Sequence, residues 1–314
     1  MDKRFRIVFI GTPDFAVPSL RALITSGEDI IAVVTQPDKP KGRGKHLTPP
    51  PVKELALKHN IPVLQPEKIR DAVFINTIRR FSPDIIVVVA YGKILPKDIL
   101  DIPPKGCINV HASLLPKYRG AAPINCAIIN GERETGVTTM LMDEGMDTGN
   151  MLLSERMEIK DNDTASDVHD RLKDIGAGLL VKTINGIKAG AVAPLPQDNS
   201  QASYAPVLKK EDGRIDWTMG AAEIRNLIRG TNPWPGAYTR WEGMQIKVFR
   251  AKVLPEGKAA EQAGTILNVS ADGISVATGR GTLVITELQP ENRDRMIVSE
   301  FIKGYRIGKG QILD

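Results

Sequence analysis

A strand-like segment ends in two polar side chains that could do chemistry. Residues 106–111 read GCINVH, and alternation along a strand places Asn109 and His111 on one face and apolar residues on the other. A parallel strand buried on both faces is usually apolar throughout, so two polar groups on one face are costly. They fit better at the carboxyl end of the strand, the edge at which open α/β sheets bind ligands. The amide and the imidazole therefore indicate a reaction centre at that edge.

Asp147 supplies the carboxylate that would complete such a centre. It lies in the loop DEGMDTG, which follows the strand-like run 136–142, and we expect that run to neighbour the strand of Asn109 and His111. An amine that attacks a carbonyl gives a tetrahedral oxyanion and a nitrogen that must lose a proton. Asn109 and a protonated His111 can donate hydrogen bonds to the oxyanion. Asp147 can orient the charged ring and accept the proton, directly or through water. The trio suits acyl transfer to an amine.

A structural role fits the same three residues. Asn109 and His111 can satisfy each other and the nearby backbone while Asp147 caps a turn, and spacing alone supports the two interpretations equally. Ser113 is a poor nucleophile candidate because no GxSxG elbow surrounds it. The chain has no HExxH, P-loop or kinase signature, so metal and phosphoryl chemistry are disfavoured and we predict no metal site.

Composition places the chain among ordinary globular proteins. Its 314 residues favour two domains, because single cores rarely grow beyond about 250–300 residues. The net charge of +5 is compatible with a polyanionic partner without proving one. The only cysteines, Cys107 and Cys126, form no metal or disulfide pattern and indicate a reducing compartment. No run is apolar for long enough to be a signal peptide or a membrane span, so we expect a cytoplasmic monomer without a membrane partner.

The order of predicted elements defines two domains. A strand at Arg6–Ile10, a helix and a second strand at Ile30–Thr35 open the chain as a β-α-β unit, and the apolar run Asp84–Ala90 predicts a central strand. The first turn, GTPDFA, lacks the glycines of a dinucleotide site. The fold expected is α/β, a Rossmann-like doubly wound sheet over residues 1–189. A linker at 190–207 precedes a small OB-like β-barrel at 208–314, predicted from one helix, 221–230, and from short strand-like runs. The runs are 237–241, 245–254, 264–269, 273–278 and 282–288.

A basic, proline-rich segment interrupts the first domain at Gln36–Pro51. It reads QPDKPKGRGKHLTPPP and carries Lys39, Lys41, Arg43 and Lys45. Loops of this length inside compact domains tend to be functional or disordered. A solvated basic loop is one interpretation. The cluster of cations around two glycines favours the other, an insert that binds phosphates.

These motifs resemble those of the 10-formyltetrahydrofolate-dependent formyltransferases. The core of the resemblance is N-x-H-x-S-L-L-P-x-x-R-G from Asn109 to Gly120, followed by Asp147 in D-x-G. It extends over most of the chain. GTPDFAVPSL, QPDKPKGRGK, AYGKILP, ASLLPKYRGAAPI, MDEGMDTGNML, KKEDGRIDW, RGTNPWPGAYT and LQPENRDRM resemble the members that act on methionyl-tRNA.

The resemblance implies both substrates and a role for each motif. It implies that 10-formyltetrahydrofolate donates a formyl group to the α-amine of methionine on initiator tRNA, with Asn109, His111 and Asp147 as the catalytic residues. By the same resemblance, Arg43 belongs to a basic insert used against the acceptor stem, together with the other three cations of that segment. The motif residues that match folate-contacting positions are Ser113, Leu114, Leu115, Pro116, Ile94 and Leu95.

Three alternatives share parts of this pattern. An N-formyltransferase for a small amine, such as an amino sugar nucleotide or glycinamide ribonucleotide, would keep the trio but would not require a cationic insert. A hydrolase would release formate without an acceptor. A nonenzymatic RNA-binding barrel protein would tolerate loss of the trio, which is intact here.

Overall fold

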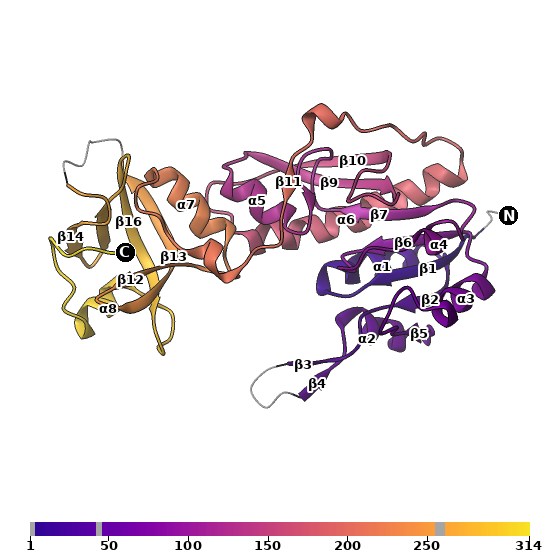
Figure 1. Ribbon diagram of the computed structural model, residues 1–314, viewed down its shortest axis with the longest axis horizontal. Coiled ribbons are helices and arrows are strands. Elements are labelled where there is room, and N and C mark those ends of the chain that lie inside the picture. The colour runs from indigo at the N-terminus through magenta and orange to yellow at the C-terminus, as the bar shows by residue number, and fades with distance from the viewer. Residues whose placement is uncertain (1–3, 42–45, 255–260) are drawn as a thin grey trace. The chain divides into compact units, whose positions relative to one another are not determined.

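The computed structural model describes residues 4–41, 46–254 and 261–314, which form two compact units (Figure 1). The first unit comprises Met1–Pro123, Glu134–Met157 and His169–Ala205. The second comprises Ile124–Arg133, Glu158–Val168 and Pro206–Asp314. Both units are therefore discontinuous in sequence. No helix in the described ranges is both long enough and apolar enough to cross a membrane.

A seven-stranded sheet organises the described part of the first unit, in the order β10-β9-β7-β6-β1-β2-β5. Its strands are β1 (Arg6–Gly11), β2 (Asp29–Val34), β5 (Val63–Leu64), β6 (Ile85–Val89), β7 (Cys107–His111), β9 (Glu134–Leu141) and β10 (Met151–Glu158). The run from β5 to β7 pairs in parallel, whereas β9 is antiparallel to β7. The strand order reverses at β1, as in a doubly wound sheet. The predicted α/β class is confirmed, and so is the predicted pairing of the 136–142 strand with the strand of Asn109.

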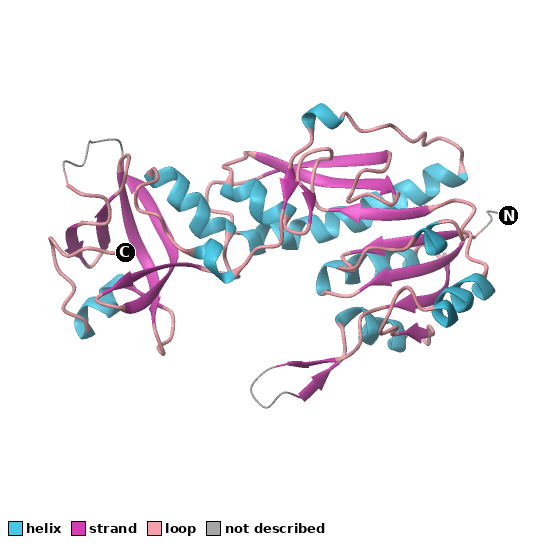
Figure 2. Cartoon of the chain, in the orientation of Figure 1, coloured by secondary structure: helices cyan, strands magenta, loops and turns pink. Residues whose placement is uncertain are grey.

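Helices connect the strands (Figure 2), and several of them bury an apolar face. In α3, Phe74, Ile75 and Ile78 are buried at the spacing of one helix face, and the Asp71 carboxylate caps the helix by accepting from the Val73 N–H. The helices are α1 (Val17–Thr25), α2 (Pro51–Lys58), α3 (Ala72–Phe81), α4 (Lys97–Leu100), α5 (Pro123–Ile129) and α6 (Ala165–Lys188). Short 3-10 turns occur at Asp14–Ala16, Asn199–Gln201 and Lys210–Gly213.

The basic segment differs from the loop expected there. It forms a hairpin in which β3 (Lys39–Lys41) pairs antiparallel with β4 (His46–Thr48). Pro40 pairs with Leu47 within it, and a proline is tolerated because each strand of a two-stranded hairpin has a free edge. The intervening residues 42–45 lie outside the described part of the chain.

An antiparallel sheet organises the second unit, in the order β12-β13-β16-β15-β14, with β17 beside β16. Its elements are α7 (Ala221–Gly230), β12 (Ala237–Trp241), β13 (Met244–Leu254), β14 (Ile266–Ser270), β15 (Gly273–Ala277), β16 (Thr282–Pro290), β17 (Met296–Ile297) and α8 (Val298–Gly304). Two residues of the C-terminal segment close the sheet. Arg240 of β12 exchanges backbone hydrogen bonds with Asp314, at 2.8 and 3.0 Å, and the Ile266 N–H of β14 donates to the Gln311 carbonyl at 2.8 Å.

The predicted small β-barrel is therefore confirmed, with strand bounds within about two residues of those expected. The sequence pattern missed β17 and α8, which are short. Phe301 of α8 is fully buried and packs edge-on against the Trp241 ring, with ring centroids 6.4 Å apart. Trp217 is also buried in this core, whereas Trp234 is 58% exposed.

A buried ion pair ties the end of α6 to the start of the sheet in the first unit. The Lys188 ammonium contacts the Glu28 carboxylate, whose side chain is only 3% exposed. The second carboxylate oxygen accepts from the Phe5 N–H at 3.0 Å, and the Lys188 Nζ also lies 5.4 Å from the centre of the Phe5 ring. Removing one partner of such a pair leaves an uncompensated charge in a buried position.

We predict that Lys188→Met lowers the free energy of unfolding of the first unit by about 3 kcal/mol, because the Glu28 carboxylate loses its counter-charge. Adding Glu28→Gln should recover part of this loss. Tryptophan fluorescence would report on the second unit, which holds Trp217, Trp234 and Trp241. Hydrogen exchange at the amides of β1 and β2 is the suitable measurement. Unchanged protection in Lys188→Met would contradict the role given to the pair.

Candidate active site

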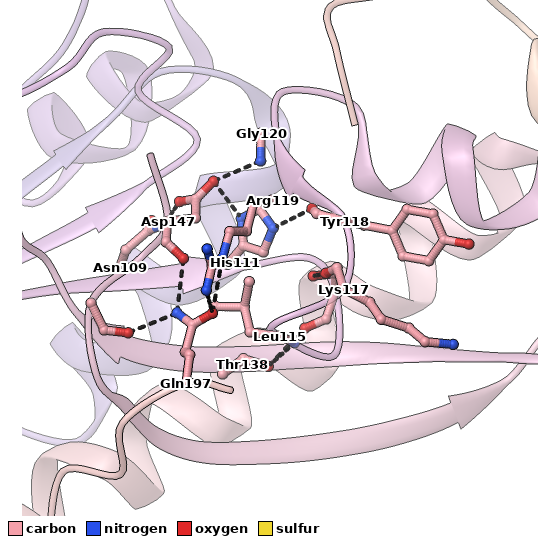
Figure 3. A network of polar contacts seen from close by, with 12 residues as sticks. Asn109, His111, Leu115, Lys117, Tyr118, Arg119, Gly120, Thr138, Asp147 and Gln197 are labelled. Carbon is pink, nitrogen blue, oxygen red and sulfur yellow. Dashed lines mark hydrogen bonds and ion pairs between the residues drawn. The ribbon is translucent and has the colours of Figure 1, made fainter. Parts of the chain in front are cut away.

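The Asp147 carboxylate lies between the amide of Asn109 and the ring of His111 (Figure 3). The Asn109 Nδ2 donates to Asp147 Oδ1 at 3.2 Å, and His111 Nδ1 lies 3.6 Å from Asp147 Oδ2. The Gly120 N–H donates to the same Oδ2 at 2.8 Å. His111 is 6% exposed and Asp147 is 17% exposed, so the carboxylate retains contact with solvent. The structure thus brings together all three residues that the sequence singled out for catalysis.

The His111 ring is held between two acceptors. Its Nε2 lies 2.9 Å from the Tyr118 carbonyl, which can only accept, so this nitrogen carries a hydrogen. Its Nδ1 faces the Asp147 carboxylate, a second acceptor. A ring with hydrogens on both nitrogens can donate to both partners at once.

The residues after β7 form a fixed turn over the neighbouring strand. The Ser113 hydroxyl donates to the Lys117 carbonyl at 2.6 Å. Thr138 of β9 is fully buried, and its hydroxyl donates to the Ser113 carbonyl at 2.8 Å and accepts from the Leu115 N–H at 3.2 Å. The Ser113 side chain is turned toward this backbone rather than toward Asp147, which agrees with its rejection as a nucleophile. The turn from Ser113 to Pro116 lies directly beyond the catalytic strand.

The loop that carries Asp147 is tightly wound. Asp147 has a φ of 54°, a left-handed conformation that aspartate tolerates better than most residues. Gly149 passes so close to β9 that an added Cβ would lie 1.8 Å from the Leu141 carbonyl oxygen, so only glycine fits. On the exposed side of the loop, the Asp143 carboxylate accepts from the Gly145 N–H and the Thr148 hydroxyl.

Sequence patterns missed the residues that surround the site from the segment 190–207. Gln197 Nε2 donates to the carbonyls of Asp147 and Gly149, at 2.8 and 2.7 Å. Its Oε1 accepts from Arg119, a cation that is only 2% exposed. Further along, β11 (Tyr204–Ala205) pairs in parallel with β8 (Arg119–Gly120). No local motif marks Gln197, and its relation to Asp147 exists only in the folded chain.

The turn after β6 reaches the same sheet edge as the turn after β7, because these strands are parallel and neighbours. In it, Leu95 is buried at 2% exposure, whereas Ile94 is 61% exposed. Gln36, at the base of the hairpin, donates through Nε2 to the Tyr91 carbonyl at 2.8 Å. The folate-contacting roles of Ile94, Leu95 and the Ser113–Pro116 turn stay predictions.

The four predicted tRNA-binding cations are described only in part. Lys39 of β3 is exposed, and its Nζ donates to Gln36 Oε1 at 2.9 Å. The backbone of Lys41 completes β3, while Arg43 and Lys45 lie outside the described residues. Their contact with nucleic acid stays a prediction.

Among the residues that the structure describes, one group of side chains has metal-ligating types. Ligand atoms of Asp14, His169 and Asp170 lie within 4.8 Å of one another. The Lys173 ammonium lies 2.6 Å from Asp170, and this hydrogen bond holds the pKa of the Asp170 carboxyl below its usual range. The group is therefore an exposed ion-pair cluster with its own cation.

Comparison with known proteins shows the family to which the chain belongs. Residues 5–184 match the family model "Formyl transferase", and residues 207–306 match "Formyl transferase, C-terminal domain". The chain belongs to the formyl transferase family.

Individual relatives show which kinds of formyl transferase this chain is similar to. The "Methionyl-tRNA formyltransferase" of Acetivibrio thermocellus is 54% identical over 98% of this chain and 99% of its own length. The protein of that name from Clostridioides difficile shows the same identity and coverage. Among solved structures, the sugar 3N-formyl transferase WlaRD, crystallised with dTDP and 5-N-formyl-THF, is 22% identical over 93% of this chain and all of its own, with a TM-score of 0.68. At that identity the likeness shows the fold alone.

Cys107, at the start of β7, gives a test of this buried strand. Burial, with a smaller contribution from the Asp101 charge, raises the pKa of its thiol from 9.0 to about 12. Burial also raises the pKa of the half-buried Cys126, with a smaller effect from Asp212.

We predict that Cys107 resists a thiol reagent at about pH 8 in the folded protein, because the thiolate is the reactive form. Cys126 should react first, and both should react after unfolding. Because the folded state keeps the Cys107 proton that the unfolded chain releases, the free energy of unfolding should fall as pH rises above 9.0. Mass spectrometry of labelled peptides measures the reactivity. Equal labelling of both thiols in the folded protein would contradict the burial argument.

Proposed function

We propose that the protein transfers the formyl group of 10-formyltetrahydrofolate to the α-amine of methionine esterified to initiator tRNA. The observation that carries the reaction type is the Asp147 carboxylate set between the Asn109 amide and the His111 ring at the sheet edge. Support for the acceptor comes from relatives 54% identical over nearly the whole chain. Support for a folate donor comes from the family and from the formyl-THF bound to WlaRD.

We assign to Asn109 the stabilisation of the oxyanion that forms during the transfer. When the amine attacks the formyl carbon, the carbonyl oxygen becomes negatively charged and needs a preorganised donor. One N–H of the Asn109 amide is engaged by Asp147, which fixes the plane of the amide and leaves its second N–H for the oxyanion. His111 acts beside it through its charge, since both of its ring nitrogens face acceptors in this structure.

We assign Asp147 as the base that accepts the proton of the attacking amine. Each carboxylate oxygen has two lone pairs. Gly120 and the His111 ring face Oδ2, whereas Oδ1 accepts from Asn109 and keeps a second lone pair for the proton. The new C–N bond forms as this proton leaves, and collapse of the tetrahedral intermediate then breaks the bond from carbon to the folate nitrogen. The folate nitrogen takes up the proton that Asp147 accepted, directly or through water, which restores the carboxylate, and tetrahydrofolate departs.

The remaining roles follow the predicted domains. Residues 1–189 carry the chemistry, with the Ser113–Pro116 turn, Ile94 and Leu95 against the folate. Residues 190–207 lead to the barrel at 208–314, which we assign to tRNA together with the basic hairpin. Up to Ala205 this segment packs as part of the first unit. Since the proposed acceptor is used in translation, we also propose that the protein is cytoplasmic. Its monomeric state stays a prediction.

A small amine on a sugar nucleotide is the second candidate acceptor. The observation in its favour is the shared fold with WlaRD over that protein's whole length. Its 22% identity is far below the 54% shared with the methionyl-tRNA formyltransferases. The deciding experiment offers 10-formyltetrahydrofolate with charged initiator tRNA, charged elongator tRNA, a dTDP-amino sugar or no acceptor. Formylation of the amino sugar but not of initiator tRNA, or release of formate without an acceptor, would overturn the proposal.

We predict that His111→Ala and Asp147→Asn each lower kcat by about 10²- to 10⁴-fold, because each removes a group that stabilises charge or takes a proton. Binding of initiator tRNA should persist, since neither side chain is assigned to it. Asp143→Asn is the matched control for Asp147→Asn: it makes the same change in the same loop and keeps an oxygen for the Gly145 N–H. Single-turnover formylation measures the step, and wild-type turnover in either site variant would refute the mechanism.

We predict that Arg43→Ala weakens the use of tRNA and leaves the KM for the folate unchanged, because a lost phosphate contact acts on the polyanion alone. The slope of log affinity against log salt should fall by about one. Arg80→Ala is the control, since it removes the same charge from an exposed site on α3. Filter binding of tRNA over a salt series makes the measurement. Equal damage to both substrates would contradict this role for the hairpin.

A further inference from the structure

Gln197 holds the backbone of the catalytic loop in the conformation that aims Asp147. We infer that Gln197, anchored by the buried Arg119, is a positioning residue for the Asp147 carboxylate, an inference that rests on the proposed function. All the atoms involved lie within the first unit.

The side chain of Gln197 makes a complete set of hydrogen bonds. Its two Nε2 hydrogens go one to the Asp147 carbonyl, at 2.8 Å, and one to the Gly149 carbonyl, at 2.7 Å. Its Oε1 uses both lone pairs to accept from Arg119 Nε and Nη2, at 3.0 and 2.8 Å (Figure 3). An amide with every position used has a single orientation, so it fixes the two carbonyls relative to Arg119.

The Asp147 carbonyl follows directly on the bend that aims the catalytic side chain, and the Gly149 carbonyl lies two residues further on. Asp147 has a φ of 54°, and its carboxylate can face Asn109 and His111 only while that bend persists. Other bonds hold the loop elsewhere: the Asp143 side chain secures its exposed side through Gly145 and Thr148. Gln197 thus contacts the backbone of Asp147 itself.

Arg119 is suited to anchor this amide. Its side chain is 2% exposed, and its Nη2 also donates to Asn199 Oδ1 at 2.8 Å. The next residue, Gly120, donates its N–H directly to the Asp147 carboxylate. Strand β8 therefore sets the carboxylate from one side through Gly120 and the Asp147 backbone from the other through Arg119 and Gln197. Pairing of β8 with β11, and the Arg119 N–H bond to the Ser203 carbonyl at 2.8 Å, hold this strand in turn.

Gln197→Glu separates positioning from structural anchoring. The carboxylate keeps the two acceptor bonds to Arg119 and adds charge to them, but it has no hydrogen for the carbonyls of Asp147 and Gly149. Asn199→Asp is the matched control: it makes the same amide-to-carboxylate change on the same arginine at a side chain whose contact is with Arg119 and not with the loop.

We expect Gln197→Glu to lower kcat for formyl transfer by about 10- to 100-fold, since small misplacements of a reacting group have effects of this size. The KM values for both substrates and the midpoint of thermal unfolding should stay near wild type, and Asn199→Asp should keep wild-type kcat. If Gln197→Glu fails to fold, Gln197→Ala, which lacks the same two donors, takes its place. A wild-type kcat in the folded variant, or an equal loss in Asn199→Asp, would overturn the inference.

A structural measurement tests the clamp independently of activity. A crystal structure of Gln197→Glu should show residues 147–149 displaced and Asp147 outside the left-handed region. An unchanged loop would overturn the inference whatever the kinetics. Failure of the wild-type protein to formylate any acceptor would refute the proposed function instead, and the loop conformation would then decide the clamp by itself.

Discussion

The position of one carboxylate sets the conditions that the rest of the first unit must meet. Asp147 accepts from Asn109 and from the Gly120 N–H and faces the His111 ring at 3.6 Å, so the two strands β7 and β8 must both converge on it. The antiparallel β9 ends beside the start of β7, whereas the parallel pairing of β6 with β7 brings the carboxyl ends of these two strands to one edge, where polar groups are tolerated. The tight course of the loop at Gly149 then returns Asp147 over that edge.

The sequence was informative where chemistry depends on residues close together in the chain. Alternation along β7 put Asn109 and His111 on one face, and apolar runs predicted the longer strands of both units to within about two residues. It was uninformative where partners are distant. The bonds of Gln197 to Asp147 and to Arg119 join residues 50 and 78 positions apart, and no period or motif encodes such a pair. The hairpin at β3 and β4 was missed for a different reason, because its prolines and glycines are the usual marks of a loop.

The base of that hairpin is more firmly held than its composition suggests. Lys53 of α2 donates to the Asp38 carboxylate and to Gln65, and the hydrogen bonds from Gln65 and Lys53 lower the pKa of Asp38. Gln36 meanwhile reaches the Tyr91 carbonyl in the turn after β6. The hairpin thus begins from an ordered polar network at the sheet edge, which fixes where β3 starts.

The discontinuity of the first unit has a consequence for the order in which the chain is made. A nascent chain that has reached the end of α6 at Lys188 already contains Asn109, His111 and Asp147, yet it lacks Gln197, Ser203 and β11. Strand β8, whose Gly120 N–H donates to the Asp147 carboxylate, can pair with β11 only when Tyr204 and Ala205 have left the ribosome. Asn109, His111 and Asp147 are therefore synthesised first and Gln197 and β11 last, so the hydrogen bonds that hold the loop of Asp147 form late in folding.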